Sequence, residues 1–476
     1  MLQPIDPPAY RGRTLTPGVA HFGVGGFHRS HQAVYQHKLL EQGLADEWAI
    51  VGIGPRRADA RMRDALVAQD CAYIVETRHP DGSSETEVIG SIIGFLLAPE
   101  DPEAVVAALS DPKLRVVTLT ITEGGYHIDH RTGVFDADDA EIAEELSGRS
   151  PRTSPFGLIC AALARRRDAG ISAFTVVSCD NIQGNGDIAR AAVVGYAAAG
   201  DPDLAAWITE RVDFPNSMVD RITPATSPAD VARIAGLTGF QDAWPVVAEP
   251  FSQWIIEDRF RYGRPPWELV GVQLVDNVAP YEKLKLRVLN GAHQALAYFG
   301  LLLGYRSVAD AAADRDLAGF VNSYLVSEVI PTLDPLPGLD VESYVESVLH
   351  RFANPAIGDT LERLATAGSD RLPAFVVPVA VDNASAGRKA TLGAAVLASW
   401  WAAATAARRD SGFTIFDPAV DALLADGGSP QMFLGAVGRF EPFPELADAF
   451  VRCCADLSAR PVRDVLIAWT NQEVGA

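Results

Sequence analysis

The sequence predicts an α/β fold in which an N-terminal domain built on a parallel sheet precedes a mostly α-helical C-terminal domain. Two patterns lead to this prediction. In the first half of the chain, short apolar runs rich in β-branched residues alternate with helical segments, as in consecutive βαβ units. After about Asp276 the β-type runs become rare and the remaining segments are almost wholly helical. We therefore expect one domain over residues 1–277 and a second over residues 278–476.

Each expected element follows from its local pattern. The run Leu114–Ile121 is apolar almost throughout and rich in β-branched residues, as expected for a strand that is buried on both faces. The other strands expected in this half are 19–24, 48–53 and 173–178, and the helices are 30–40, 58–69 and 156–169. The helices expected in the second half are 279–302, 308–330, 340–352, 389–408 and 443–457.

Length and charge limit the class of protein. The chain of 476 residues is long enough for two or three domains of about 150 residues. Forty Lys and Arg face 61 Asp and Glu, which leaves a net charge of −21. A surface this acidic repels nucleic acid and anionic membranes, so we expect neither as a general partner.

The cysteines and the apolar segments indicate a soluble cytoplasmic protein. The five cysteines are odd in number and scattered, which suits a reducing compartment better than a disulfide framework. The first residues lack the apolar stretch of a secretory signal. The segment Ala390–Ala407 has no charge and approaches the shortest membrane span of ~17 residues. Because it is mostly alanine, we expect a buried helix with Trp400 and Trp401 packed inside a helical domain.

The first chemical motif is HFGVGGFHR at residues 21–29. A strand that runs into G-x-G and then into a helix has the geometry of a dinucleotide-binding turn, in which glycines let the backbone approach a pyrophosphate. His28 replaces the third glycine, and the alternative is a strand-to-helix turn that simply needs small residues. Its position at the first strand favours cofactor binding and a Rossmann-like domain. The candidate cofactor-binding residues here are Gly23, Gly25, Gly26, Phe27 and His28.

The cofactor type depends on the residues after the second strand. Asp59 is placed to accept a hydrogen bond from a ribose 2′-hydroxyl, which favours NAD. Arg56 or Arg57 would instead hold a 2′-phosphate, and all three residues are also compatible with solvated charges at a helix start. We expect NAD.

Two further strand ends carry polar residues. The segment TITEGGY places Thr122 and Glu123 after the third expected strand, and SCDNIQGNG places Asn181 after the fourth. Ligands bind at the carboxyl ends of strands in open parallel sheets. Turn residues such as Asp, Asn and Gly also belong to ordinary loops, so each cluster alone leaves site and turn open.

The densest group of reactive side chains is EKLKLRVLNGAH at residues 282–293. On a helix that turns by about 100° per residue, Glu282 lies roughly 60° from Lys285, His293 roughly 80° and Asn290 roughly 140°. One helix face therefore gathers a carboxylate, an amine, an imidazole and an amide. The alternative is an amphipathic helix whose polar face is in water, but the strongly apolar flanking residues favour a site.

Such a face suits the oxidation of a secondary alcohol. Lys285 can accept the hydroxyl proton when burial or a nearby cation lowers its pKa. Asn290, with Asn181 from the sheet, can donate hydrogen bonds to the developing oxyanion. His293 would orient a neighbouring hydroxyl, and Glu282 would relay the proton to water.

These motifs resemble a known family, the polyol-specific long-chain dehydrogenases of the mannitol 2-dehydrogenase group. The segments that carry the resemblance, in the family's order over residues 18–400, are FGVGGFHRSHQ, TLTITEGGY, SCDNIQGNG, FPNSMVDRITP, KLRVLNGAH and RFANPAIGDTLERLATAGSDRLPAF. The resemblance implies an N-terminal Rossmann-like domain, a helical C-terminal domain, a metal-independent active site between them and a monomer.

The resemblance also implies residue roles. Lys285 is the general acid/base, Asn181 and Asn290 bind the oxyanion, His293 holds the substrate and Glu282 gates proton exit. Three further positions match the family's substrate-contacting or active-site positions. They are Asp220, Arg363 and Arg371, the last standing where many members have lysine.

The resemblance implies NAD-dependent oxidation of D-mannitol to D-fructose, with D-arabinitol and D-sorbitol as further substrates. Fructuronate or tagaturonate reduction in the same family is the alternative, because Arg363 and Arg371 can hold a carboxylate. A non-catalytic dinucleotide-binding sensor is the alternative from another class.

Two other enzyme classes fit less well. Tyr281 and Lys285 have the Tyr-x-x-x-Lys spacing of short-chain dehydrogenases, but they lie beyond residue 280 without a matching glycine motif. A zinc enzyme would draw on His28 and His31 with the pair Cys179-Asp180, which does not close a convincing three-ligand site.

Overall fold

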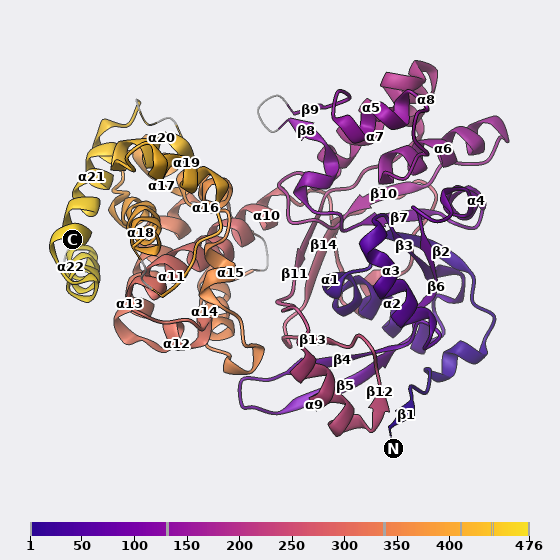
Figure 1. Cartoon of the computed structure of the whole chain (residues 1–476), viewed down its shortest axis with the longest axis horizontal. Helices are drawn as coiled ribbons and strands as arrows, with labels where there is room; N and C mark the ends of the chain where they lie inside the picture. The colour runs from indigo at the N-terminus through magenta and orange to yellow at the C-terminus, as the bar shows by residue number, and fades with distance from the viewer. Residues whose placement is uncertain are drawn as a thin grey trace. The chain divides into compact units, whose positions relative to one another are not determined.

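The computed structural model describes residues 2–129, 133–336, 339–409, 412–438, 440 and 442–474. The chain forms two compact units (Figure 1). The first unit comprises Met1–His79 with Ser83–Ala279, and the second comprises Pro80–Gly82 with Pro280–Ala476.

A five-stranded sheet forms the centre of the first unit, and every neighbouring pair in it is parallel. Its strands, in spatial order, are β10 (Thr175–Ser178), β7 (Val116–Leu119), β2 (Pro17–Phe22), β3 (Ala49–Gly54) and β6 (Ile92–Leu97). Successive residues of these strands enter opposite cores, since Val117 packs in one hydrophobic cluster and Val116 in another. Burial on both faces explains the continuous apolar runs of the sequence.

Helices cover this sheet and join its strands (Figure 1). Four of them begin at a capping side chain followed by proline, which suits the first helical turn. Asp101 accepts from the Ala104 N–H, and Ser154 accepts from the Gly157 N–H. The helices of this unit are α1 (Gly26–Ser30), α2 (Gln32–Glu41), α3 (Ala60–Val67), α4 (Pro102–Ser110), α5 (Ala140–Leu146), α6 (Pro155–Asp168), α7 (Asn185–Gly200), α8 (Pro202–Arg211) and α9 (Pro228–Thr238).

Smaller sheets accompany the parallel sheet in this unit, and none of their strands was predicted. Their strands are β4 (Tyr73–Arg78), β5 (Ser84–Ile89) and β13 (Val246–Ala248) in one, and β11 (Ser217–Asp220), β14 (Gln253–Glu257) and β15 (Gln273–Val275) in another. Two short pairs complete the set, β1 (Gln3–Pro4) with β12 (Phe240–Gln241) and β8 (Ile128–Asp129) with β9 (Val134–Phe135). Several of these strands are short or exposed, and others depend on partners distant in the sequence, as β13 does on β4 and β11 on β14.

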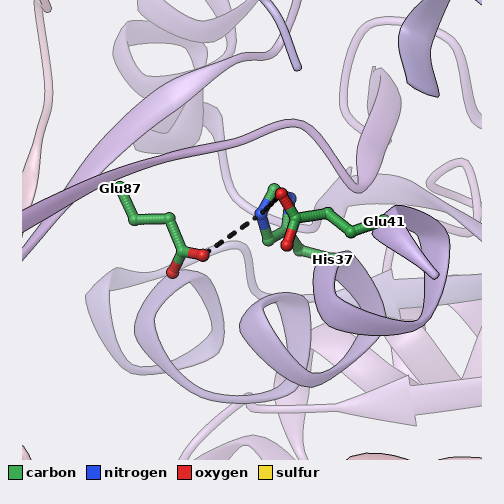
Figure 2. A group of neighbouring side chains, drawn as sticks. All are labelled: His37, Glu41 and Glu87. Atoms are coloured by element: carbon green, nitrogen blue, oxygen red, sulfur yellow. Dashed lines mark ion pairs between the residues drawn. The ribbon is translucent and has the colours of Figure 1, made fainter. Parts of the chain in front are cut away.

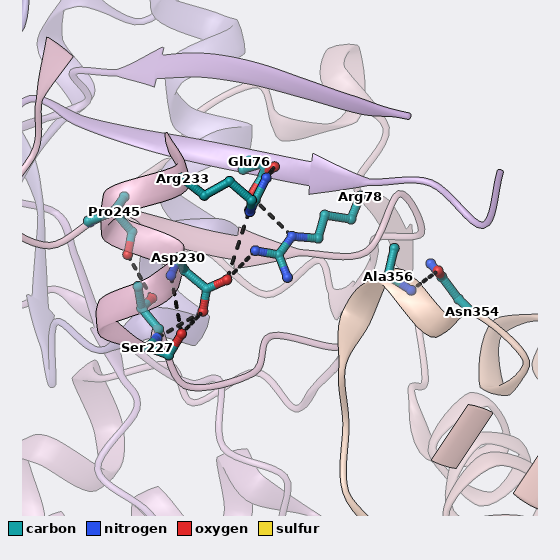
Figure 3. Close-up of polar contacts among 9 residues, drawn as sticks. Glu76, Arg78, Ser227, Asp230, Arg233, Pro245, Asn354 and Ala356 are labelled. Atoms are coloured by element: carbon teal, nitrogen blue, oxygen red, sulfur yellow. Dashed lines mark hydrogen bonds and ion pairs between the residues drawn. The ribbon is translucent and has the colours of Figure 1, made fainter. Parts of the chain in front are cut away.

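An ionic network ties helix α9 to strand β4 (Figure 3). Glu76 is fully buried in β4 and pairs with Arg78 and with Arg233 of α9. Arg78 also pairs with Asp230, whose carboxylate accepts hydrogen bonds from the Ser227 N–H at 2.9 Å and the Ser227 hydroxyl at 2.6 Å. The buried carboxylate of Glu76 is therefore compensated by two guanidinium groups, those of Arg78 and Arg233, as a buried charge requires.

In the described part of the second unit the regular elements are helices, with an isolated antiparallel β-bridge between Ser307 and Thr360. Its helices are α10 (Ala279–Lys285), α11 (Gly291–Leu302), α12 (Val308–Ala313), α13 (Arg315–Tyr324), α14 (Val341–Phe352), α15 (Leu361–Ala365), α16 (Gly368–Phe375), α17 (Val377–Ser385), α18 (Thr391–Ala407), α19 (Pro418–Ala425), α20 (Pro430–Val437), α21 (Pro444–Ala459) and α22 (Val462–Val474). With the parallel sheet of the first unit, these helices confirm the predicted fold class.

The uncharged segment of the sequence is the buried helix α18. Its Trp400 is fully buried in the core of this unit, and the partly buried Trp401 donates from Nε1 to the Gly428 oxygen at 2.9 Å. Among the described residues, no helix combines the length and the apolar character needed to span a membrane.

Two predicted helices are broken in the structure. The helix expected over 308–330 is interrupted at Asp314, whose side chain caps α13 by accepting from the Asp316 and Leu317 N–H groups. The helix expected over 30–40 forms as α1 and α2, separated at His31 with φ −119° and ψ −91°. The apolar period did not reveal either break, because a cap or kink of one residue leaves the hydrophobic spacing almost unchanged.

Candidate active site

The turn after β2 requires glycine at its first position. Gly23 has φ +90°, and a Cβ at this position would lie 2.0 Å from the backbone oxygen of Thr120. The Gly25 N–H donates to the Gly23 oxygen at 2.7 Å, which closes the turn. Both the left-handed backbone and the close approach of β7 exclude a side chain at Gly23.

The next two glycines have space around them. A Cβ on Gly25 would meet nothing closer than 3.8 Å, and one on Gly26 nothing closer than 3.6 Å. The fold itself therefore tolerates a methyl group at both positions. Gly25 instead leaves room for a ligand beside the backbone, which is the role of the second glycine in a dinucleotide-binding turn.

A pocket of about 290 Å³ opens at this turn. It gathers four of the expected cofactor-binding residues, which are Gly23, Gly25, Asp59 and Thr122. Its wall also contains Met62, Phe95 and Trp244, which the sequence analysis missed because apolar wall residues have no pattern of their own. The residues present fit a dinucleotide, since glycine backbone, a carboxylate and apolar surface line one cavity.

Phe27 and His28 do not line this pocket. Phe27 stacks on His31 with ring centroids 4.9 Å apart. His28 is buried and stacks on His21 at 3.3 Å, and its Nδ1 lies 3.3 Å from Gln32 Oε1. Burial, with the neighbouring His21, holds the pKa of His28 well below its usual range, so His28 is a neutral interior residue at the position of the third glycine.

His21 holds the glycine turn through contacts of its ring nitrogens, and it was not predicted from the sequence. Its Nε2 lies 3.1 Å from the Gly23 oxygen and 2.9 Å from Thr120 Oγ1, while Nδ1 lies 2.7 Å from Thr118 Oγ1. Burial lowers the pKa of His21 to about 3. Because the ring stays neutral, it can donate to the turn and accept from a threonine.

Asp59 is held at the wall of the pocket by a cap of its own. It ends a short 3₁₀ helix (Arg57–Asp59), and its Oδ2 accepts from the Arg56 N–H at 2.9 Å. Arg56 lines the same pocket. The carboxylate that favours NAD and one of the guanidinium groups that favour NADP are thus both present.

The loop after β7 is shaped by Asp180. This buried carboxylate accepts from the Ile121 N–H at 3.0 Å, the Thr122 N–H at 2.9 Å and the Tyr126 hydroxyl at 2.6 Å. It thereby holds Thr122 at φ +67° on the pocket wall. Burial and the Asp180 charge hold the pKa of Tyr126 well above its usual range. The side chain of Glu123 lies outside the described residues.

The remaining expected residues of the first unit lie near the end of β10 and in β11. Asn181 is exposed in the loop after β10. Asp220 is the last residue of β11, buried and opposite Gln253 of β14. Asn185 joins these two regions, since its Nδ2 donates to the Asp180 oxygen at 3.0 Å and the Ser217 oxygen at 2.8 Å.

In the second unit, the four expected reactive residues lie on one continuous helical segment. Glu282, Lys285, Asn290 and His293 are each only 7 to 8% exposed, so their face is buried by the protein and is not a wet surface. Between α10 and α11 the residues Leu286–Asn290 form a π-helical turn. The uniform rotation of 100° per residue was therefore wrong here, because i→i+5 hydrogen bonds change the angular spacing.

His293 packs flat against Phe352, with ring centroids 4.1 Å apart. Burial holds its pKa well below the usual range, and the charges of Arg363, Arg351 and Lys285 act in the same direction. Its Nε2 is buried and makes no hydrogen bond within the described residues. A neutral imidazole with an unused buried nitrogen is suited to hydrogen bonding with a substrate hydroxyl.

Both expected arginines, Arg363 and Arg371, form hydrogen bonds with residues of the second unit. Arg363 forms a bidentate pair with buried Asp359, at 2.6 and 2.5 Å. Arg371 donates from one guanidinium nitrogen to the Arg363 oxygen at 3.3 Å and the Leu364 oxygen at 3.0 Å. Arg351 is a buried third arginine whose charge acts on His293. It was not predicted from the sequence, although it begins the RFANP segment that carries the family resemblance.

The zinc alternative finds no support in the placement of its residues. Within the described ranges, the group of His, Cys, Asp and Glu side chains spaced to hold an ion consists of His37, Glu41 and Glu87. It contains neither His28 nor Cys179, and both lie in the interior.

A glycine-turn pocket on a parallel sheet and a buried lysine face on a helical unit define the class of two-domain Rossmann-type dehydrogenases. Comparison with protein families gives the particular member of that class. Residues 17–269 match the mannitol dehydrogenase Rossmann domain, and residues 277–454 match the mannitol dehydrogenase C-terminal domain. The chain belongs to the mannitol dehydrogenase family, and the resemblance seen in its motifs is confirmed.

Individual relatives are similar over most of their length. The chain is 46% identical to a polyol:NADP oxidoreductase of Gluconobacter oxydans over 78% of this chain and 76% of the relative. It is 43% identical to mannitol 2-dehydrogenase of Cereibacter sphaeroides, over 87% of this chain and 86% of that relative. Among solved structures, the mannitol 2-dehydrogenase of Pseudomonas fluorescens in a ternary complex with NAD and D-mannitol has 40% identity and a TM-score of 0.87, covering 96% of this chain and 95% of that chain.

Proposed function

We propose that this protein catalyses the NAD-dependent oxidation of a secondary alcohol of a sugar alcohol to the 2-ketose, with D-mannitol to D-fructose as the first candidate reaction. One observation carries the proposal. In a member of the mannitol dehydrogenase family, Lys285, Asn290 and His293 share a buried helical segment across a π-helical turn. A sensor that only binds a dinucleotide has no need of this face.

Each residue has a distinct role in the proposed reaction. Lys285 accepts the proton of the substrate hydroxyl, and Asn290 donates a hydrogen bond to the oxygen as it gains negative charge. His293, neutral because of burial and cationic neighbours, holds an adjacent hydroxyl. NAD, when bound, supplies the hydride acceptor.

The proposal assigns three further roles. Glu282, buried on α10 one turn before Lys285, passes the proton to water. Asn181 of the first unit is a second amide donor to the oxyanion, and Asp220 contacts the substrate. The chemistry at these residues is proposed to need no metal ion.

NAD is favoured over NADP by the carboxylate on the pocket wall. Asp59 would accept a hydrogen bond from a ribose hydroxyl and repel a 2′-phosphate. Arg56 on the same wall, and the relative named for NADP, make NADP the alternative to be tested. Of the residues expected at the cofactor, we propose that those on the pocket wall hold the dinucleotide, namely Gly23, Gly25, Asp59 and Thr122, together with Glu123, which follows Thr122 in the chain.

A uronate is the second candidate substrate, favoured by the positive charge around His293. Arg351, Arg363 and Arg371 all act on this imidazole, and a substrate carboxylate would be attracted to them. Asp359 compensates one of these charges, which supports the neutral polyol as the first candidate.

The test compares substrates and cofactors in one series. Initial rates are measured with NAD and NADP on D-mannitol, D-arabinitol and D-sorbitol, and with the reduced cofactors on D-fructuronate. If the protein reduces NAD with D-mannitol, and if this activity is lost in Lys285→Ala, the result supports the proposal. Activity confined to the uronate would keep the mechanism and replace the substrate. Cofactor binding without turnover on any substrate would support a sensor.

We further propose that the protein works as a monomer in the cytoplasm. The five cysteines are all buried and none forms a disulfide, which supports a reducing compartment. Sedimentation analysis tests the oligomeric state directly.

A further inference from the structure

A second polar cluster lies in the first unit, apart from the glycine-turn pocket. His37 and Glu41 are four residues apart on α2 and therefore share one helix face. Glu87 reaches the same point from strand β5. Figure 2 shows both carboxylates directed at the imidazole of His37. None of the three residues lines the pocket at the glycine turn.

The distances match those of metal ligands. His37 Nε2 lies 3.4 Å from Glu41 Oε1 and 3.4 Å from Glu87 Oε1. Two ligands that are each ~2.1 Å from a tetrahedral ion are about 3.4 Å apart. One ligand atom of each residue lies within 4.8 Å of both others, so a small rotation of the half-exposed glutamates brings all three onto one ion.

The imidazole is oriented as in a metal site. The His37 side chain is 1% exposed, and its Nε2 makes no hydrogen bond although it faces two carboxylates. Its other nitrogen, Nδ1, lies 2.7 Å from the hydroxyl of buried Tyr10, which also accepts from the Gly90 N–H at 3.0 Å. With the proton on Nδ1, the Nε2 lone pair points between the two carboxylates. A partner on the second ring nitrogen is the usual feature that fixes a metal-binding histidine.

A lone pair facing two anions is unfavourable unless a positive charge lies between them. The point between the ring and the two carboxylates is therefore occupied either by a hydrogen on Nε2, which would donate to the carboxylates, or by a bound cation.

We propose that His37, Glu41 and Glu87 bind one Zn²⁺ ion at a site separate from the proposed active site. One imidazole and two carboxylates suit zinc, because imidazole prefers zinc to the hard cations Mg²⁺ and Ca²⁺. Glu87 also lines a cavity of about 520 Å³ in the same unit, through which water reaches the ion and supplies a fourth ligand. The ion would join α2 to β5 and so stabilise the second helix after the glycine turn.

The experiment titrates Zn²⁺ alone into chelator-treated, full-length protein by calorimetry near neutral pH. The expected result is one high-affinity ion per chain, with an affinity lowered ~10-fold or more in Glu41→Gln and in Glu87→Gln. Co²⁺ in place of Zn²⁺ should give the visible absorption of a tetrahedral site in the parent protein alone. Both variants keep side-chain size, and circular dichroism with NADH binding checks that they fold.

The matched control is Glu85→Gln. Glu85 lies on β5 two residues before Glu87 and is within 3.5 Å of another histidine, His79, but it is not part of the cluster. Its variant should bind Zn²⁺ with the affinity of the parent. Zinc affinity that is equal in all three variants, or absent from the parent protein, would overturn the proposal and leave a proton as the cation between His37 and the glutamates.

A turnover measurement on the chelator-treated and zinc-loaded protein distinguishes this site from the proposed active site. Turnover of the chelator-treated enzyme should equal that of the zinc-loaded enzyme, because the ion binds no reacting atom. Loss of turnover on chelation that zinc restores would contradict a site separate from the chemistry.

Discussion

The pocket at the glycine turn and the buried face on α10 and α11 are built in opposite ways. At the turn, the structure removes side chains, so that Gly23 lets two backbones meet and Gly25 leaves space. On the helical face, it buries ionisable side chains, among them Lys285 and His293. We propose that the first region recognises its ligand by shape and backbone, whereas the second acts on the substrate by charge.

The difference predicts how each region fails. A methyl group added at the turn acts by steric conflict, either with the fold or with the ligand. Removal of the Lys285 amine from the helical face introduces no steric conflict but removes the proposed proton acceptor. Substitutions in the two regions should therefore be separable by measuring stability, cofactor binding and turnover on the same variants.

The largest expected effect is that of Lys285→Ala. Loss of a general base should lower kcat by ~10²–10⁴-fold while NADH affinity stays within about twofold. Steady-state kinetics and NADH fluorescence titration provide the two numbers. Lys283→Ala is the matched control, since Lys283 lies on the same helix but pairs with Asp334 at 3.0 Å. A kcat reduced less than tenfold, or reduced equally by the control, would remove Lys285 from the chemistry.

Two glycine substitutions test the other region. Gly23→Ala combines φ +90° with a Cβ 2.0 Å from a backbone oxygen, so we expect a loss of unfolding free energy of about 3 kcal/mol or more. Gly25→Ala meets nothing within 3.8 Å and should change stability by less than about 1 kcal/mol while weakening NADH binding. Urea unfolding and NADH titration measure both variants.

Gly26→Ala is the control for these two variants. It lies in α1, and its Cβ would be 3.6 Å from Thr223, so neither stability nor NADH affinity should fall. If Gly25→Ala bound NADH as tightly as the parent, the space at Gly25 would not be where the dinucleotide lies.

The sequence predicted those parts of the fold that depend on nearby residues. Val116–Leu119 was identifiable as a strand because an apolar, β-branched run has few other uses. Strand β5 was missed, since four of its six residues are exposed and its pairing with β4 provides what its own sequence lacks. The break at Asp314 shows the same limit, because one capping side chain ends a helix without disturbing the apolar period.

The site was predictable to a similar extent. Glycine spacing pointed to Gly23 and Gly25, and both line the pocket. The same motif pointed to His28, which the structure instead stacks on His21 in the interior. Trp244 reaches the pocket from a distant loop, and no local pattern could reveal it. On the helical face, the four predicted residues share one buried segment, but the π-helical turn altered the angles between them.

Acidification should affect the two regions unequally. His21, with a pKa lowered to about 3, and His28 are buried as neutral rings in the first unit, and His293 is neutral in the second. Each is protonated more readily when unfolded, where the pKa is ~6.5, so stability falls as the pH falls below ~6.5. The loss approaches about 1.4 kcal/mol per pH unit for each histidine.

Amide hydrogen exchange measures this loss of stability when it is compared just above the unfolded pKa and about one pH unit below it, with each rate corrected for the intrinsic exchange rate. In this range most carboxylates do not yet titrate. The first unit, with two such histidines, should lose protection more than the second. His28→Gln removes one titrating ring and should reduce the difference. Equal losses in the two units would show that these histidines do not control acid stability.

The smallest expected effect is on cofactor choice, and it tests whether charge also matters at the turn. Asp59→Asn keeps an acceptor for the Arg56 N–H but removes the charge that repels a 2′-phosphate. The ratio of kcat/KM for NADP to that for NAD should rise about tenfold, equivalent to about 1.4 kcal/mol. Asp64→Asn is the control, because Asp64 is exposed on α3, pairs with Arg63 and does not line the pocket. An unchanged ratio in Asp59→Asn would mean that this carboxylate serves only as a cap, and that the pocket discriminates by shape alone.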